Sequence, residues 1–232
     1  MRAHGDDRIP KHHTYQAKKI GLTSTHSFVE LKSTLHLFSF DMADLHSEGT
    51  NSIILLLNGA SSSGKTSLAN AIQSFDKKRY TVASIDSFIK EKIQDYTHVI
   101  NLNNHIVQSL LNAFNQHIQR LALSYDLVIV DHVLGEKKAW IDQLNADLKL
   151  LTTYRIKIFC APTELIKREN LRTDRPADTT HALRQEQEIH RHFKYDLSYD
   201  TQKESYSQIA KQVLAHLAQK HPSLTLSPDY EP

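Results

Sequence analysis

The sequence has only one cysteine and no long apolar run, and each absence narrows what the protein can be. A single thiol, Cys160, cannot form an internal disulfide, which suits a reducing compartment. No apolar stretch reaches the ~18 residues that a membrane-spanning helix needs. The first twenty residues are polar and rich in histidine, without the apolar segment of a secretory signal. We therefore expect a cytoplasmic protein that does not enter a membrane.

An excess of charge of one sign is also absent. Lysine and arginine total 28 and aspartate and glutamate total 26, which leaves a formal charge of +2. Because there is no long basic run either, the charge predicts no nucleic-acid partner. The 15 histidines do not indicate a structural metal site, since His190 and His192 would face different sides of a helix.

Composition divides the chain into three parts. Residues 1–50 form an extension, in which residues 1–21 lack apolar periodicity and predict a mobile tail. Residues 28–40 are more apolar and fit either a strand or a short helix. Residues 51–220 are expected to form one domain, long enough to bury a sizeable core, and residues 221–232 a second tail.

Strands and helices alternate from Ser52 onward. Apolar runs and alternating patterns predict strands at residues 53–57, 80–85, 127–130, 154–159 and 195–199. Apolar residues at helical spacing predict helices after the first strand, at 106–121, 163–171 and 182–193, and before Pro222. This alternation predicts an α/β fold with a five-stranded parallel sheet flanked by helices.

A glycine-rich turn joins the first strand to the first helix. Its sequence matches G-x-x-x-x-G-K-[ST] at every fixed position. Glycines allow close approach to phosphate oxygens, and successive N–H groups at a helix start supply partial positive charge. The predicted phosphate-binding residues are Gly59, Ala60, Ser61, Ser62, Ser63, Gly64, Lys65, Thr66 and Ser67. The turn predicts ATP binding, with Lys65 on the β- and γ-phosphates and the Thr66 hydroxyl on Mg²⁺.

Two acidic residues follow predicted strands and should face the same crevice. Asp86 comes after the second strand, where a carboxylate can take the proton of an acceptor hydroxyl or bind the acceptor. Alternatively, Asp86 caps a helix that begins at Ser87. Asp131 follows four apolar residues in the Walker B manner and is a predicted Mg²⁺ ligand. The adjacent His132 either contacts substrate or lies in a solvated loop.

Arginines are concentrated after the fourth strand, in a segment interrupted by polar residues and a proline. They are Arg168, Arg172, Arg175 and Arg184. Such a segment above the strand ends predicts a lid, whose guanidinium groups neutralise the transferring phosphoryl group on closure. The alternative is a pair of solvated helices with surface ion pairs.

These motifs together resemble the chloramphenicol phosphotransferase family. The similarity rests on the run from Leu56 to Thr66 and on four further stretches in the same order, spanning about residues 52–217. Those stretches are Asp86-Ser87-Phe88-Ile89, Val128-Ile129-Val130-Asp131, Arg168-Glu169 through Arg172-Thr173-Asp174-Arg175, and Tyr195-Asp196 with Asp200-Thr201. The resemblance implies a P-loop kinase fold, Asp86 as the catalytic base, and Arg172 and Arg175 as lid arginines. The chain departs from the family at Thr173, where glycine is common, and at His132, where a second acid is expected.

The function predicted from these residues is transfer of the γ-phosphoryl group of ATP to a hydroxyl of a small molecule, either antibiotic-like or a metabolite. Lys65, Asp86, Arg172 and Arg175 are the predicted catalytic residues, and ATP and Mg²⁺ the predicted cofactors. Asp86 lies 21 residues after Lys65 (86 − 65), which suits a kinase with a separate acceptor. A nucleoside or nucleotide kinase and a nucleotide-dependent regulatory switch are the alternatives.

Overall fold

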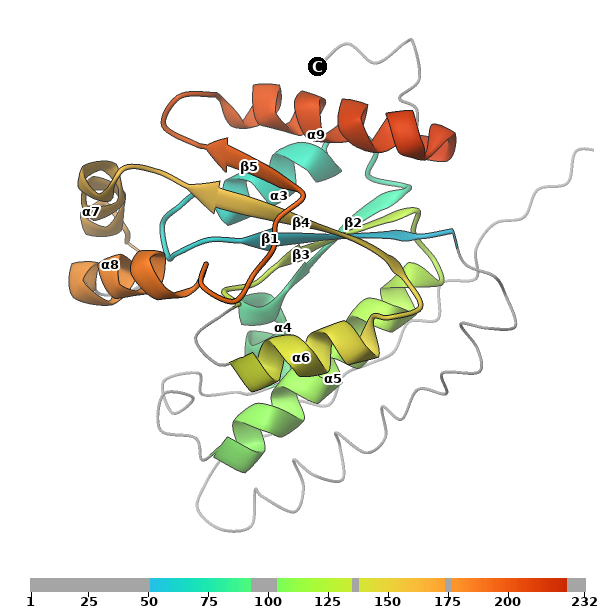
Figure 1. The fold of residues 1–232 in the computed structure, drawn as a ribbon, viewed down its shortest axis with the longest axis horizontal. Helices are drawn as coiled ribbons and strands as arrows, with labels where there is room; N and C mark the ends of the chain where they lie inside the picture. The colour runs from blue at the N-terminus through green and yellow to red at the C-terminus, as the bar shows by residue number, and fades with distance from the viewer. Residues whose placement is uncertain (1–50, 93–103, 135–137, 174–176, 225–232) are drawn as a thin grey trace, which may run out of the picture.

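A parallel five-stranded sheet forms the centre of the molecule (Figure 1). The structure is a computed structural model that describes residues 51–92, 104–134, 138–173 and 177–224, so the predictions for residues 1–50 lie outside the described residues. The spatial order of the strands is β2-β3-β1-β4-β5, and each neighbouring pair is parallel. The strands are β1 (Ile53–Asn58), β2 (Tyr80–Ser84), β3 (Leu127–Asp131), β4 (Thr152–Phe159) and β5 (Leu197–Asp200).

Helices cover both faces of the sheet and one of its ends (Figure 1). On one face lie α3 (Lys65–Gln73) and α9 (Tyr206–Lys220). On the other lie α4 (Ile85–Lys92), α5 (Asn104–Ala122) and α6 (Lys138–Asp147). Beyond the carboxyl ends of the strands, α7 (Pro162–Asn170) and α8 (Thr179–Glu188) lie side by side. No helix in the described parts of the chain combines the length and hydropathy needed to cross a bilayer.

The unbroken apolar run of β1 arises because both faces of this strand are buried. Ile53, Leu55 and Leu57 pack into one core with residues of α3 and α9. Ile54 and Leu56 point the other way, into a second core with residues of α5 and the segment around α6. The central position of β1 therefore holds the turn that follows it between two packed layers.

The predicted fold class is confirmed, and the differences are shifted element boundaries and one additional helix. The second strand ends at Ser84 and the third includes Asp131. The helix predicted at 182–193 spans Thr179–Glu188 instead, because the Asp178 side chain caps its first turn by accepting from His181 N–H. Helix α6 was not predicted, although Ile141 and Leu144 show helical spacing and are buried.

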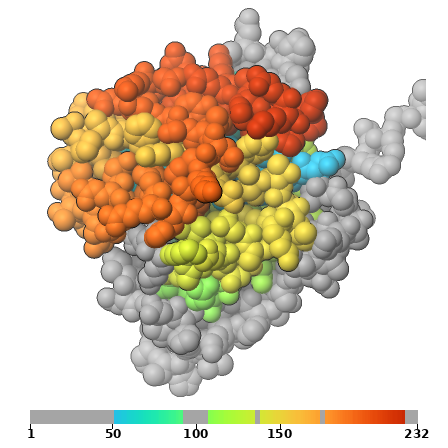
Figure 2. Space-filling model, in the orientation of Figure 1, coloured from blue at the N-terminus to red at the C-terminus, as the bar shows by residue number. Residues whose placement is uncertain are grey.

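The chain after α9 remains part of the fold. A short 3-10 helix, η2, covers Pro222–Leu224 and so ends four residues after residue 220, where the domain was expected to end. Leu224 is buried in the same core as α3 and α9, and its carbonyl accepts a hydrogen bond from the Tyr80 hydroxyl at 3.4 Å. In the space-filling view the C-terminal third of the chain, coloured gold to red, forms one continuous surface (Figure 2).

The central packing of β1 predicts a large loss of stability on truncation. Leu55 is fully buried, so Leu55→Ala is expected to lower the free energy of unfolding by about 2–5 kcal/mol. Leu171→Ala is the matched control, because Leu171 is 70% exposed and its truncation should change stability by only about 0.5 kcal/mol. Urea unfolding measures both. Equal losses in the two variants would contradict the described core.

Candidate active site

The predicted site residues gather where the chain changes sides of the sheet. Helix α3, which follows β1, lies on one face, whereas α6, which follows β3, lies on the other (Figure 1). Because β1 and β3 are neighbours, a crevice forms beyond their carboxyl ends. A cavity of about 610 Å³ lies there, lined by residues of the phosphate loop, α4, α5, the end of β3 and α7.

Two glycines give the phosphate loop its shape. A Cβ atom on Gly59 would lie 2.1 Å from the Ile158 carbonyl oxygen of β4, so any side chain would push the loop off the sheet. Gly64 has φ +101°, a conformation that L residues rarely adopt, immediately before α3. Ser62 also has a positive φ, 61°, which is a strained backbone for a serine. The loop therefore holds a tight, fixed curve.

The predicted phosphate-binding residues separate into two groups. Six of them line the cavity: Ser61, Ser62, Gly64, Lys65, Thr66 and Ser67. The other three, Gly59, Ala60 and Ser63, are buried and do not line the cavity. Ser63 is used for support, since its carbonyl accepts a hydrogen bond from the Thr201 hydroxyl at 2.7 Å.

Lys65 lies in the floor of the cavity. Its ammonium group donates to the Ala60 carbonyl at 2.8 Å. Burial lowers the pKa of Lys65, while the nearby carboxylates of Asp131 and Asp86 oppose this shift. Those two acids are therefore close enough to act on the lysine, as predicted for a single crevice.

Thr66 and Asp131 form an oxygen-rich pair at the cavity wall. The Thr66 hydroxyl donates to a carboxylate oxygen of Asp131 at 2.6 Å. Hydroxyl and carboxylate oxygens are ligands that Mg²⁺ prefers, and Mg²⁺ in kinases takes its other ligands from phosphate and water. In the described residues no group of three or more His, Cys, Asp and Glu could hold a metal on its own. The Thr66–Asp131 pair thus fits a cation that arrives with a nucleotide.

Asp86 lies across the cavity, in the first turn of α4 and exposed to solvent. Its predicted place at the end of the second strand is off by two residues, because β2 ends at Ser84. The helix begins at Ile85, which puts the N-cap position on Ser84 rather than Asp86. The Ser84 hydroxyl lies 3.5 Å from the Ser87 nitrogen, as a weak cap.

His132 is buried rather than solvated, so the solvated-loop interpretation is wrong. It follows Asp131, lines the cavity, and meets the Phe114 ring edge-on with centroids 5.7 Å apart. Burial, and then the charge of Lys65, lowers the pKa of His132 to about 3. Neither ring nitrogen has a hydrogen-bond partner among the described residues.

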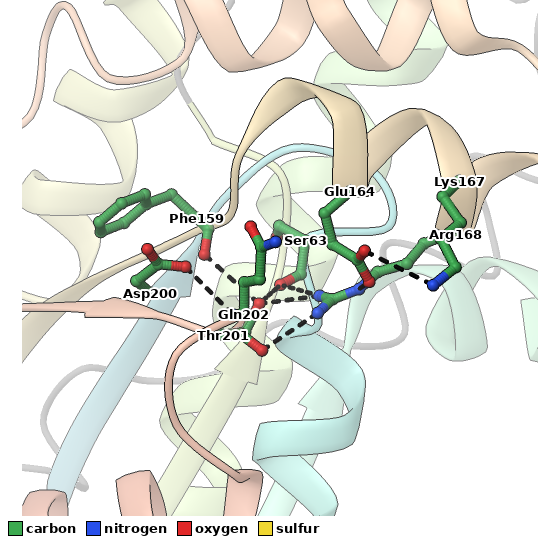
Figure 3. Close-up of polar contacts among 8 residues, drawn as sticks. All are labelled: Ser63, Phe159, Glu164, Lys167, Arg168, Asp200, Thr201 and Gln202. Atoms are coloured by element: carbon green, nitrogen blue, oxygen red, sulfur yellow. Dashed lines mark hydrogen bonds and ion pairs between the residues drawn. The ribbon is translucent and has the colours of Figure 1, made fainter.

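Arg168 ties three segments together (Figure 3). Its Nε donates to Glu164 at 2.8 Å within α7. Its two terminal nitrogens donate to the Thr201 hydroxyl at 2.8 Å and the Thr201 carbonyl at 3.0 Å. Because the Thr201 hydroxyl in turn donates to Ser63, Arg168 connects α7, the turn after β5 and the phosphate loop.

The other predicted lid arginines have different surroundings. Arg172 is half-buried, lines the cavity and lies close enough to Lys65 to lower its pKa. Arg184 is exposed on α8, 3.0 Å from His181. Arg175 lies outside the described residues. Of the described arginines in this segment, Arg168 and Arg172 are the two at the cavity.

Two polar residues on α7 and α8 were missed by the sequence analysis. The buried carboxylate of Glu169 accepts from the hydroxyls of Ser62 at 2.6 Å and Ser61 at 3.2 Å. The side-chain carbonyl of Gln185 accepts from the Ser61 N–H at 3.0 Å. Both lie on the buried stripes of their helices, four residues after Leu165 and three after Ala182. A polar residue on an apolar stripe is the sequence signal that marks them.

Removing Glu169 should loosen the phosphate loop. Glu169→Ala leaves the Ser61 and Ser62 hydroxyls and the Asp178 N–H without this acceptor, so we expect the free energy of unfolding to fall by roughly 1–3 kcal/mol. Glu169→Gln is the matched control: it keeps the shape and one acceptor oxygen, and should lose less. Urea unfolding of the two variants measures the difference, and equal stability of Ala and Gln variants would contradict the role of these bonds.

Several solved structures share this fold. Structures similar to it include the tunicamycin resistance protein of Deinococcus radiodurans (16% identity, TM-score 0.56, covering 76% of this chain and 99% of that one). A second is a gluconokinase of Sinorhizobium meliloti 1021 (19% identity, TM-score 0.51, covering 73% of this chain and 94% of that one). A third is the APS kinase of Mycobacterium tuberculosis in complex with AMPPNP and APS (18% identity, TM-score 0.50, covering 72% of this chain and 97% of that one). At these identities the likeness shows the fold.

Among curated protein sequences, none matches the chain. The family model of chloramphenicol phosphotransferase-like proteins matches residues 52–218, which include the whole sheet, the residues that line the cavity, α7, α8 and all but the last two residues of α9. The chain has the phosphate loop, the Thr66–Asp131 pair and the parallel sheet that its sequence predicted, and it belongs to the chloramphenicol phosphotransferase-like family.

Proposed function

We propose that the protein transfers the γ-phosphoryl group of ATP to a hydroxyl group of a small molecule. The observation that supports this proposal is the set of residues that line one cavity. The phosphate loop, the Thr66–Asp131 pair and Asp86 all line it. Family membership supports the reaction class. A regulatory switch would not require an exposed carboxylate such as Asp86 in the cavity of the phosphate loop.

The nucleotide half of the reaction rests on the loop and its neighbours. Backbone N–H groups of the loop and the start of α3 would hold the phosphates, and Lys65 would leave the Ala60 carbonyl for the β- and γ-phosphate oxygens. Thr66 and Asp131 would hold Mg²⁺, which neutralises charge on those oxygens when bound. Arg172, two residues after the end of α7, would approach the transferred group from that segment.

The acceptor half has a mostly apolar wall. It is made by Ile85, Ile89, Val107, Leu111, Val133 and Trp140. The cations among the described lining residues are Lys65, Arg168 and Arg172, all in the phosphate loop or the segment after β4. An acceptor with an apolar body suits this wall better than a carboxylated or phosphorylated one. This favours an uncharged alcohol over a nucleotide acceptor.

Asp86 is the proposed general base. As the acceptor oxygen bonds to the γ-phosphorus and the bond to the ADP oxygen breaks, the hydroxyl proton moves to the Asp86 carboxylate. The exposed position of Asp86 in the first turn of α4 leaves its carboxylate accessible to an acceptor.

A screen for acceptors tests the reaction itself. Purified protein is incubated with ATP and Mg²⁺ and with chloramphenicol, tunicamycin, gluconate, shikimate or adenosine monophosphate. Mass spectrometry then detects the gain of one phosphoryl group. We expect gain on an uncharged alcohol and none with Lys65→Ala. Gain on adenosine monophosphate alone would instead establish the nucleotide kinase alternative, and ATP binding without any transfer would favour a switch.

Substitutions of Asp86 and of Lys65 should impair different steps, catalysis and nucleotide binding respectively. Asp86→Asn keeps size but removes the proton acceptor, so kcat should fall by ~10²–10⁴-fold while ATP affinity is retained. Lys65→Ala should weaken ATP–Mg²⁺ binding, because it removes the buried cation of the loop. Steady-state kinetics and calorimetry with a non-hydrolysable ATP analogue separate the two effects. An Asp86→Asn variant with nearly intact kcat would exclude the base.

A further inference from the structure

His132 lies in the chain between Asp131 of the proposed cation site and Val133 of the apolar wall, and all three residues line the cavity. It directly follows Asp131 at the end of β3, is 9% exposed, and lines the same cavity as Asp86 and Trp140. The charge of Lys65 acts on it from the nucleotide side. A group at this position can contact an acceptor without belonging to the phosphate loop.

The ring nitrogens of His132 are an anomaly in the buried part of the molecule. A neutral imidazole has one N–H donor and one acceptor nitrogen, and neither has a partner among the described residues. A buried polar group left in this state costs about 1–3 kcal/mol, so native proteins rarely keep one without a use. Of the described side chains with unpartnered buried atoms, His132 is the one that lines the cavity.

Packing alone does not explain a histidine here. Its edge-on contact with Phe114 needs an aromatic or aliphatic group but no nitrogen. A leucine or phenylalanine would fill similar space without the cost of unpaired polar atoms. The nitrogens are themselves buried, and a half-turn of the ring about its Cβ–Cγ bond exchanges Nδ1 with Cδ2 and Nε2 with Cε1. A hydrogen bond between a ring nitrogen and a ligand therefore requires such a turn of the ring.

We propose that His132 positions the acceptor, by a hydrogen bond between a ring nitrogen and a polar group of the acceptor other than the reacting hydroxyl. This inference rests on the proposed phosphotransferase function. The apolar wall holds the body of the acceptor, and His132 fixes its rotation so that the reacting hydroxyl points at Asp86 and the γ-phosphoryl group. The acceptor class is then an uncharged alcohol that carries a second polar group, such as another hydroxyl or an amide.

Three substitutions at this position test the proposal by kinetics. The probe is whichever of the two uncharged alcohols, chloramphenicol or tunicamycin, the wild-type protein phosphorylates. His132→Leu removes both nitrogens, and we expect KM for that probe to rise about tenfold or more with KM for ATP unchanged. His132→Asn and His132→Gln place an amide near Nδ1 and Nε2 respectively, and at least one should recover part of the loss.

Phe114→Leu is the control for packing. It removes the ring against which His132 lies and keeps the imidazole, so it should lower the Tm without raising KM for the probe. A readout independent of turnover uses protein labelled with ¹⁵N-histidine and bound to AMP-PNP and Mg²⁺. The His132 ring nitrogens should change chemical shift when the probe is added.

The outcomes separate this inference from the proposed function. The positioning role is wrong, while transfer stands, if His132→Leu keeps the wild-type KM for the probe. It is also wrong if the His132 ring nitrogens of the wild-type protein do not respond to the probe. Should the Leu variant fail to fold, the Asn and Gln variants and the wild-type nitrogen shifts still decide the question. Wild-type protein that phosphorylates neither chloramphenicol nor tunicamycin, or that phosphorylates only gluconate or shikimate, overturns the proposed acceptor class, and the role of His132 with it.

Discussion

The close approach of Gly59 to β4 is the contact on which the rest of the site depends. β1 and β4 are hydrogen-bonded neighbours, and the loop leaves β1 so near to Ile158 that no Cβ fits between them. The chain must then rise over the sheet and enter α3 through the left-handed conformation of Gly64. This path puts Lys65 and Thr66 beside Asp131, at the end of the strand on the other side of β1.

A second set of contacts holds the loop from the C-terminal third of the chain. The Thr201 hydroxyl donates a hydrogen bond to the Ser63 carbonyl (Figure 3). Glu169 accepts from the hydroxyls of Ser61 and Ser62, and Gln185 accepts from the Ser61 N–H. Sites of this kind need their first layer of residues fixed by a surrounding layer, because small displacements are costly to catalysis. The loop curve is thus set by two distant parts of the sequence acting together.

The sequence predicts local features and not distant ones. The phosphate loop and Asp131 were found because each lies within a short contiguous pattern that one strand and one turn determine. Thr201 is named only within a stretch that resembles the family, and Gln185 not at all. Their contacts are not predicted because they reach residues 138 and 124 positions earlier, and no local pattern encodes such a contact. Asp86 is predicted at the end of a strand but lies in the first turn of a helix, because β2 ends two residues earlier, at Ser84. His132 was noticed as a departure from the family, and only its burial reveals the unpaired nitrogens.

Trp140 is the single tryptophan in the sequence, and it lines the cavity from α6. Indole emission depends on the polarity and quenching groups around the ring, so every change in tryptophan fluorescence of this chain originates at the proposed acceptor wall. The phosphate loop lies on another side of the same cavity. Trp140 is therefore an intrinsic optical reporter by which occupancy of the proposed acceptor wall would be followed in real time, without a label and without turnover.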